Sequence, residues 1–316
     1  MQGRLESDKR IRARTGKLLE DSPEYLKEYY YSLSSVKTPS TAYNYVVYVK
    51  AFINSLKTQP NRVSDIKVSD VGEFFNSKMD KSNNYIRMLH SSLSSFFDYF
   101  VMSGEIEKNP LVTIKKPKAR NMQEKDCPTV QEFNELVEYV RVESNPLWVK
   151  QNILILYMLM LTGMRVSALT EIDISDFDFK NATVSVITKG EKRQVYNILP
   201  IRDKIIDYIE TDRKRILDGY PMTEALFLST HRKRISVSAV QRFIKAMSER
   251  AWVGSYTPHD FRRAFVTTLL EKTGDIAFVS RAVGHSDVST TMRYAISNGK
   301  ESEKSAEILG SMLKLK

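Results

Sequence analysis

The sequence predicts a mainly α-helical protein of two domains with one small antiparallel β-sheet. Its 316 residues exceed what one domain of roughly 150 residues would use. Apolar side chains recur at helical spacing through most of the chain, whereas only two short runs, residues 183–188 and 194–199, have β-strand character. A stretch rich in lysine and proline separates the helical patterns into two groups.

The charge balance indicates a polyanionic partner. Lys and Arg number 48 against 38 Asp and Glu, which gives a net charge of +10, and the hydrophobic content of 42% still supports packed domains. One cysteine, Cys127, excludes an internal disulfide and a cysteine-rich zinc site. The longest apolar run, residues 153–161, is much shorter than the ~20 residues of a membrane span, and the N-terminus has no apolar signal segment. We expect a cytoplasmic protein without a membrane span.

The N-terminal half divides into three segments by composition. Residues 1–20 are rich in cations and poor in apolar periodicity, which predicts a basic arm. Residues 21–107 carry apolar stripes typical of amphipathic helices, which predicts a small all-α domain. Residues 108–126 begin KNPLVTIKKPKAR, with prolines, cations and no acid, and this composition predicts a basic linker.

The second domain is expected over residues 127–295. Helical periodicity restarts there, residues 153–161 suit a buried helix, and the two β-prone runs flank the sequence KGEKR, which suits the turn of a hairpin. Residues 296–316 form a tail with apolar side chains at helical spacing. The tail could dock on a neighbouring copy or pack on its own domain, and the sequence leaves both open.

A candidate anion site lies in the segment TPHDFR. Thr257 suits a helix N-cap, proline suits the first turn, and Asp260 stands three residues after the cap. His259 and Arg262 then share one face near a helix N-terminus, where backbone N–H groups and the helix dipole favour an oxyanion. Taken alone, this pair is more often an ordinary surface histidine and arginine.

Two further patterns strengthen that site. Arg165 follows the most apolar helix of the chain, where a cation needs an anionic partner to offset its desolvation. His285 follows another apolar stretch, and Tyr294 comes nine residues later. With Lys189 in the hairpin turn, these residue types make a plausible set for processing a phosphate ester.

Three segments resemble the boxes of the tyrosine recombinase (phage integrase) family. TGMRVSALTEI is similar to the first-arginine box, HDFRRAFVTTLL to the His-x-x-Arg box, and VGHSDVSTTMRYA to the box of the glycine-histidine pair and the nucleophilic tyrosine. They stand in the family's order, with the hairpin lysine between the first two. The resemblance implies an all-α core-binding domain, a mixed α+β catalytic domain, and an exchange helix in the tail.

The resemblance also implies the chemistry of the site. The two arginines would stabilise charge on the phosphate, one histidine would act as base and the other as donor, the lysine would protonate the leaving oxygen, and the tyrosine would form a 3′-phosphotyrosyl link without ATP or metal. The candidate catalytic residues are Arg165, Lys189, His259, Arg262, His285 and Tyr294. The candidate DNA-binding cations are Lys115, Lys116, Lys118, Arg120, Arg232, Lys233 and Arg234.

One position departs from the family pattern. Where the family places an acid three residues after the first arginine, this chain has Ala168, and Glu171 one turn later is a candidate substitute. We therefore expect a site-specific recombinase for integration or excision of a mobile element. Replicon-dimer resolution, DNA inversion, topoisomerase-like nicking and a weakly catalytic DNA-binding relative are the alternatives. The expected partner is duplex DNA with inverted-repeat sites, bound by a homotetramer on two sites.

Overall fold

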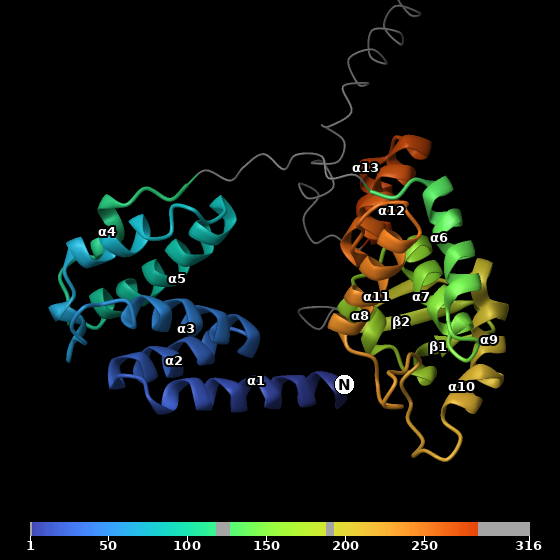
Figure 1. Cartoon of the computed structure of the whole chain (residues 1–316), viewed down its shortest axis with the longest axis horizontal. Coiled ribbons are helices and arrows are strands. Elements are labelled where there is room, and N and C mark those ends of the chain that lie inside the picture. The colour runs from blue at the N-terminus through green and yellow to red at the C-terminus, as the bar shows by residue number, and fades with distance from the viewer. Residues whose placement is uncertain (1, 118–126, 188–192, 284–316) are drawn as a thin grey trace, which may run out of the picture. The chain divides into compact units, whose positions relative to one another are not determined.

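The computed structural model describes residues 2–117, 127–187 and 193–283, which form two compact units (Figure 1). Unit 1 runs from Met1 to Gln123 and unit 2 from Glu124 to Lys316. The described part of the chain is mainly helical with one three-stranded antiparallel sheet, which confirms the predicted fold class. Lys118, Arg120, Lys189, His285, Tyr294 and the tail at 296–316 lie outside the described residues.

Unit 1 is a bundle of helices around an aromatic core. Its elements are α1 (Gln2–Glu20), α2 (Glu24–Val36), α3 (Pro39–Ile53), η1 (Val63–Asp65), α4 (Val68–Asn76), α5 (Asn83–Met102) and η2 (Pro110–Thr113). Both long inner helices begin at hydroxyl caps, since Thr38 accepts the N–H of Thr41 and Ser82 accepts the N–H of Tyr85. The apolar stripes of α3 and α5 meet through edge-to-face contacts such as Phe52 against Phe97, with ring centroids 6.0 Å apart.

The N-terminal segment is a helix of this bundle, not a separate arm. α1 packs on α3, and its side chains Thr15 and Leu19 are buried. Lys50 of α3 also donates a hydrogen bond to the carbonyl of Leu18. The buried positions cluster at the end of α1, so the cation-rich sequence before them hid the apolar contact that orders the helix.

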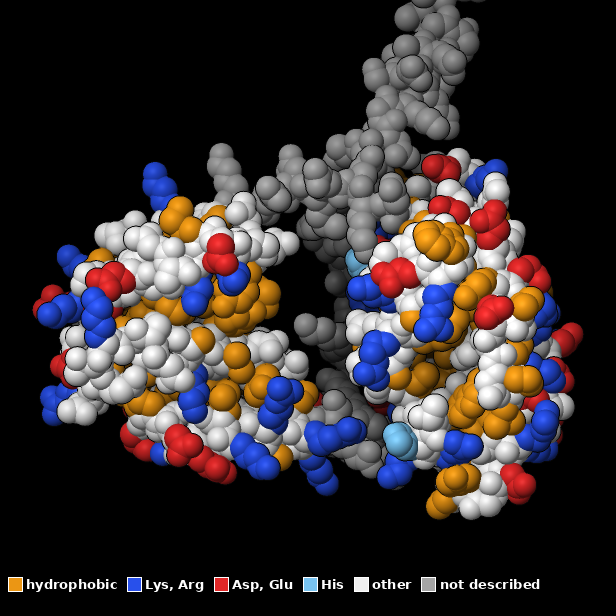
Figure 2. All heavy atoms as spheres, in the orientation of Figure 1, with side chains coloured by type: hydrophobic (Ala, Val, Ile, Leu, Met, Phe, Trp, Pro, Cys, Tyr) orange, Lys and Arg blue, Asp and Glu red, His pale blue; other side chains and the backbone are white. Residues whose placement is uncertain are grey.

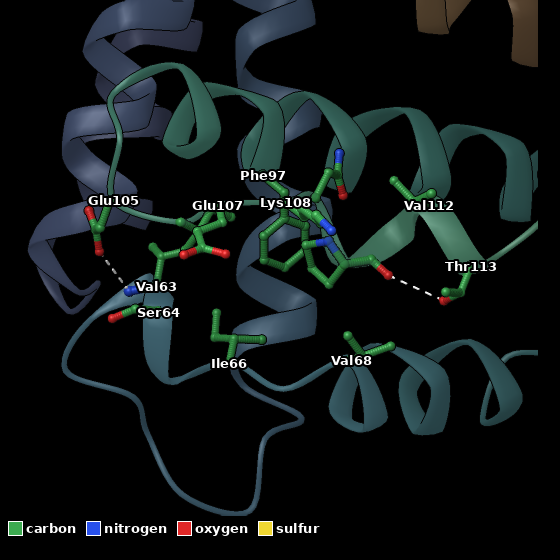
Figure 3. A pocket seen from close by; sticks show the side chains of 13 residues that line it. Val63, Ser64, Ile66, Val68, Phe97, Glu105, Glu107, Lys108, Val112 and Thr113 are labelled. Atoms are coloured by element: carbon green, nitrogen blue, oxygen red, sulfur yellow. Dashed lines mark hydrogen bonds between the residues drawn. The ribbon is translucent and has the colours of Figure 1, made fainter.

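The predicted linker begins later than its composition suggested. Leu111 is buried in the core of unit 1, Arg87 donates to the carbonyl of Pro117 at 2.6 Å, and a His90 ring nitrogen lies 2.9 Å from the carbonyl oxygen of Ile114. Figure 3 shows the start of this segment beside η1, where the carboxylate of Glu105 accepts the N–H of Val63 at 3.0 Å. Residues 108–117 therefore belong to unit 1.

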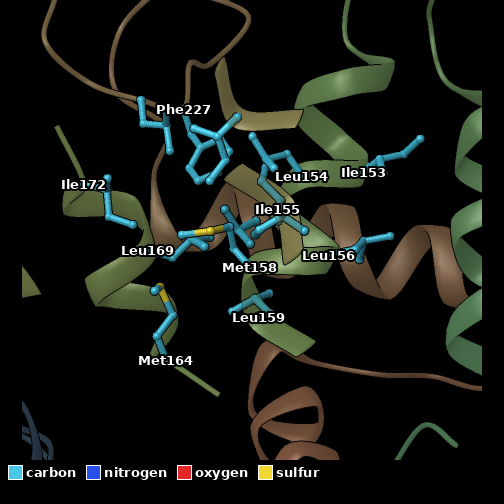
Figure 4. Packing of buried hydrophobic residues seen from close by; sticks show 14 of the residues in the cluster. Ile153, Leu154, Ile155, Leu156, Met158, Leu159, Met164, Leu169, Ile172 and Phe227 are labelled. Atoms are coloured by element: carbon cyan, nitrogen blue, oxygen red, sulfur yellow. The ribbon is translucent and has the colours of Figure 1, made fainter. Parts of the chain in front are cut away.

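In unit 2, several helices and a small sheet surround one apolar helix, α7. Its elements are α6 (Val130–Glu143), α7 (Val149–Thr162), α8 (Val166–Glu171), η3 (Ile174–Asp176), β1 (Phe177–Asp178), β2 (Thr183–Ile187), β3 (Arg193–Asn197), η4 (Leu199–Ile201), α9 (Arg202–Glu210), α10 (Asp212–Ile216), α11 (Val237–Arg250), α12 (Pro258–Thr273) and α13 (Ile276–Val283). Ile155, Leu156 and Met158 of α7 are completely buried, and Figure 4 shows them packed with Leu169 and Phe227 from other segments.

The sheet confirms the predicted hairpin and adds a strand. β2 and β3 pair antiparallel, with Val184 opposite Tyr196 and Ile187 opposite Arg193. The short strand β1 joins the other edge of β2 and was not expected, because two residues leave no alternating pattern in the sequence. Among the described residues, no helix is long and apolar enough to cross a membrane.

Candidate active site

Helix α12 starts as its sequence predicts. The carboxylate of Asp260 accepts the backbone N–H of Thr257 at 2.8 Å and its hydroxyl at 2.7 Å, and Pro258 occupies the first helical position. This capping box satisfies polar groups at the start of the helix, and its carboxylate, that of Asp260, is buried. The start of α12 therefore fixes where Arg262 lies.

Arg262 is buried where several elements of unit 2 meet. Its Nη1 donates to the carbonyl oxygen of Gly163 at 2.6 Å, and its Nη2 donates to that of Val283 at 3.1 Å. These two acceptors come from the end of α7 and the end of α13. Both are neutral carbonyl groups that fix the orientation of the guanidinium group, whose planar, paired donors suit it to bind an anion.

Arg165 lies at the N-cap of α8 and is exposed. The sequence led us to expect a desolvated Arg165 beside the apolar helix, but the left-handed residue Gly163 ends α7 and the chain turns to the surface. Within the described residues, the side chain of Arg165 makes no hydrogen bond or ion pair. Its charge nevertheless acts on the Tyr196 hydroxyl, as does that of Arg262, so both arginines border the same region.

His259 lies on the first turn of α12 and is exposed, whereas Arg262, one turn later, is buried. The three-residue spacing keeps them on one side of the helix, as predicted. Arg165, His259 and Arg262 all lie in unit 2, and Arg262 contacts the carbonyl of Gly163, two residues before Arg165. The described residues hold no cluster of three His, Cys, Asp or Glu side chains that could bind a metal ion.

The predicted cation cluster at 232–234 makes contacts within the protein. The guanidinium carbon of Arg232 lies 5.0 Å from the centroid of the Tyr220 ring and 5.7 Å from that of the Trp148 ring. Arg234 donates to the carbonyl of Thr170 at 3.0 Å and pairs with Asp173. Lys233 is exposed, whereas Arg232 and Arg234 are partly buried.

Tyr196 is a site residue that the sequence reasoning missed. It is 5% exposed and stands at the buried position of β3, opposite Val184. Burial raises the pKa of the Tyr196 hydroxyl above its ordinary value, against the lowering influence of Arg262 and Arg165. The hydroxyl is therefore neutral at physiological pH. A polar aromatic residue at the inward position of a strand next to the candidate Lys189 is the only signal the sequence offered.

The family model described as the phage integrase family matches residues 129–301. The chain belongs to this family. It is accordingly a DNA strand-exchanging tyrosine recombinase.

Relatives and solved structures agree with that membership. Tyrosine recombinase XerD of Staphylococcus epidermidis is 30% identical over 266 residues, covering 78% of this chain and 86% of the relative. XerD of Staphylococcus saprophyticus is 35% identical over 213 residues, covering 65% of this chain and 68% of the relative.

Among solved structures, a lambda integrase dimer bound to a COC′ core site has a TM-score of 0.67 at 20% identity, covering 85% of this chain and 93% of that one. XerH recombinase in a post-cleavage complex with palindromic difH has a TM-score of 0.66 at 18% identity, covering 86% of this chain and 80% of that one. These two likenesses show a shared fold.

The surface charge of the recombinase is mixed. On the face shown in Figure 2, Lys and Arg side chains lie among Asp and Glu side chains on both units. Net charge therefore does not identify a DNA-binding surface on that face. Such a surface has to be identified from the positions of individual cations.

Gly163 of the recombinase ends α7, and its carbonyl accepts a hydrogen bond from Arg262. We expect Gly163→Ala to be strongly destabilising. Its φ of +59° is left-handed, and a Cβ atom there would lie 2.5 Å from Cδ1 of Phe265 on α12. The backbone strain costs about 1–2 kcal/mol and the overpacking about 1–3 kcal/mol more in the free energy of unfolding. Chemical denaturation of unit 2 measures the loss.

Gly274→Ala is the matched control for this prediction. Gly274 also caps a helix with φ +65°, but a Cβ atom there meets nothing within 4 Å. It should show the backbone cost alone. Equal losses in the two variants would mean that Phe265 yields to the new methyl group and that the close approach of Gly163 to α12 has no energetic importance.

Proposed function

We propose that this recombinase cleaves and rejoins duplex DNA at specific sites through a 3′-phosphotyrosyl intermediate on Tyr294. The observation that carries the proposal is Arg262, a buried guanidinium group that donates to the carbonyl oxygens of Gly163 and Val283, together with the exposed Arg165 two residues after Gly163. Attack on a phosphodiester concentrates negative charge on its non-bridging oxygens. Two preorganised guanidinium groups stabilise that charge by paired hydrogen bonds.

The remaining roles follow from the protons that must move. A phenol with a pKa near ~10 is a weak nucleophile at neutral pH, and His259 at the exposed start of α12 is the proposed base for Tyr294. The bond from phosphorus to the 5′ oxygen breaks as the bond to the tyrosine oxygen forms. Lys189 is proposed to protonate that leaving oxygen, and His285 to donate a hydrogen bond to the phosphate. The product keeps one phosphodiester bond for each bond broken, so a 5′ hydroxyl from another duplex can reverse the step without ATP.

The test is a suicide duplex whose nick lets the short cleaved fragment diffuse away. Labels on either side of the cleavage position report which strand end carries the protein. A DNA adduct that survives SDS and is joined through the 3′ phosphate supports the proposal. A 5′ linkage, or no adduct on any cognate site, contradicts it.

The biological role we favour is resolution of replicon dimers. The sequence alone suggested integration or excision of a mobile element, but the relatives at 30–35% identity are XerD recombinases. We propose that a homotetramer acts in the cytoplasm on two inverted-repeat sites, as the lambda integrase tetramer sits on a Holliday junction in a structure of the same fold. A plasmid dimer with two direct copies of the site should be reduced to monomers. Activity confined to a site pair of unlike sequence would favour mobile-element integration instead.

DNA binding should depend steeply on salt through the cations that follow α5. Lys115 and Lys116 are exposed in the described chain, and Lys116 is held by a hydrogen bond to Ser91 at 2.6 Å. Each phosphate that a cation neutralises contributes a slope of about −0.9 to log K against log salt concentration. The test variant changes four cations to glutamine: Lys115, Lys116, Lys118 and Arg120. Its slope should be shallower by up to that amount for each phosphate that is no longer neutralised. Fluorescence anisotropy on one duplex measures the slope.

A second fourfold variant controls for net charge alone. It changes four exposed lysines of unit 2 that lie outside the proposed DNA-binding set: Lys180, Lys204, Lys214 and Lys272. Its slope should stay near that of the unaltered chain. If the salt slope of the first variant differs from that of the unaltered chain no more than the control's does, residues 115–120 do not contact DNA.

A further inference from the structure

The last described residues of unit 1 lie along one polar side of α5. Four positions of that helix recur at spacings of four, three and four residues, so they share one side: Arg87, Ser91, Ser94 and Asp98. The side-chain amide of Asn109 donates to the carboxylate of Asp98 at 2.7 Å and to the carbonyl oxygen of Ser94 at 3.2 Å. Nearer the start of α5, Lys116 donates to the Ser91 hydroxyl at 2.6 Å. Residues 109–117, the exit segment, therefore run antiparallel to α5.

Arg87 holds the end of the exit segment. Its Nη1 donates to the carbonyl oxygen of Pro117 at 2.6 Å. Proline has no backbone N–H, so this carbonyl is the one polar group that the backbone of Pro117 offers. One turn further along α5, a His90 ring nitrogen lies 2.9 Å from the carbonyl oxygen of Ile114, which can only accept a hydrogen bond. Arg87 and His90 thus hold the backbone on both sides of residues 115 and 116.

Those two residues are Lys115 and Lys116, which contact DNA phosphates in the proposed function. Both are exposed. The ammonium group of Lys116 has three donors, so its hydrogen bond to Ser91 leaves two for a phosphate. A free chain would have to be ordered before it could hold two cations against a DNA backbone, and the entropy lost in that ordering lowers affinity. In this protein the ordering takes place when unit 1 folds.

We propose that Arg87 is a positioning residue for DNA binding, which holds Pro117 against α5 and thereby keeps Lys115 and Lys116 in place for the DNA backbone. The inference rests on the proposed function. It adds to that function a residue that acts through the exit segment and not through a phosphate contact of its own.

The first test is the rate of trypsin cleavage after Lys115 in the absence of DNA. Arg87→Ala removes the hydrogen bond to Pro117, so the exit segment should detach more often and cleavage should quicken roughly tenfold. Arg87→Lys keeps a donor for the same carbonyl and should restore most of the protection. An unaltered cleavage rate in Arg87→Ala would overturn the inference, because the segment would then be held without Arg87.

The second test is DNA affinity, measured by fluorescence anisotropy. Arg87→Ala should weaken binding roughly 2- to 10-fold and leave the salt slope unchanged, since the same phosphates are neutralised once the segment is ordered. In a background of Lys115→Gln and Lys116→Gln it should weaken binding no further, because Arg87 acts through those lysines. A slope shallower by about 0.9 in both backgrounds would mean that Arg87 itself neutralises a phosphate, and would overturn its positioning role.

Arg62→Ala is the matched control. Arg62 is an exposed arginine of unit 1, and its backbone N–H, which alanine keeps, donates to Asp65 at 3.1 Å. Cleavage after Lys115 and DNA affinity should both match the unaltered chain, and equal losses in both variants would overturn the role of Arg87. Faster cleavage of Arg87→Ala with unaltered affinity would overturn that role alone and leave the proposed function in place. An unaltered chain that binds no duplex would overturn the proposed function and this inference together.

Discussion

Tyr294→Phe is expected to abolish the SDS-resistant DNA adduct while leaving DNA binding intact. The change removes the phenolic oxygen that would form the new bond to phosphorus and keeps the aromatic ring. No neighbouring group can replace that oxygen without a different covalent linkage, so the expected loss is complete rather than partial. Gel electrophoresis of the suicide-substrate reaction measures the adduct, and a mobility shift measures binding.

Tyr220→Phe serves as the control for a tyrosine in general. Tyr220 is half exposed in unit 2, and its ring lies under Arg232, an interaction that phenylalanine preserves. The control should form the adduct at the unaltered rate. An adduct formed by Tyr294→Phe would identify another residue as the nucleophile and would require a new assignment of the box that contains it.

Local chemistry made part of the site predictable. The cap of α12 was readable because Thr257, Pro258 and Asp260 act within one turn of helix, and the structure confirms that start. The hairpin was readable for the same reason, since its strand pattern needs only its own residues. Features of this kind depend on neighbours in sequence, which a single chain displays in full.

Features that depend on distant neighbours were missed or misplaced. α1 was taken for an arm because its ordering comes from contacts with α3, and residues 108–117 were taken for a linker because Leu111 enters the core of unit 1. Arg165 was expected to be the desolvated arginine, yet Arg262 is the buried one. The sequence could not show this, because the carbonyl groups that Arg262 contacts lie 99 and 21 residues away along the chain. Tyr196 escaped notice because the two arginines that lower its pKa, Arg165 and Arg262, are distant from it in sequence.

Arg262→Lys is expected to slow cleavage by on the order of 10² or more, with little change in DNA affinity. An ammonium group has no planar fork, so it cannot keep the bonds to Gly163 and Val283 and also present paired donors to a phosphate. Affinity should change little because one phosphate contact is a small part of a site that uses many. Single-turnover cleavage at saturating DNA separates the two effects. Arg281→Lys, at an exposed position of α13, is the control and should cleave at the unaltered rate.

Replacing a buried arginine can also reduce cleavage by destabilising the folded protein. Arg165→Lys separates that explanation from a loss of catalysis. Arg165 is exposed, and its side chain has no partner within the described residues, so its replacement should leave the thermal transition of unit 2 in place. If both arginines bind the phosphate in the transition state, Arg165→Lys should lose cleavage to a similar degree as Arg262→Lys. If Arg165→Lys cleaves at the unaltered rate while Arg262→Lys unfolds, Arg262 is a structural residue, and the proposed pair of phosphate ligands does not exist.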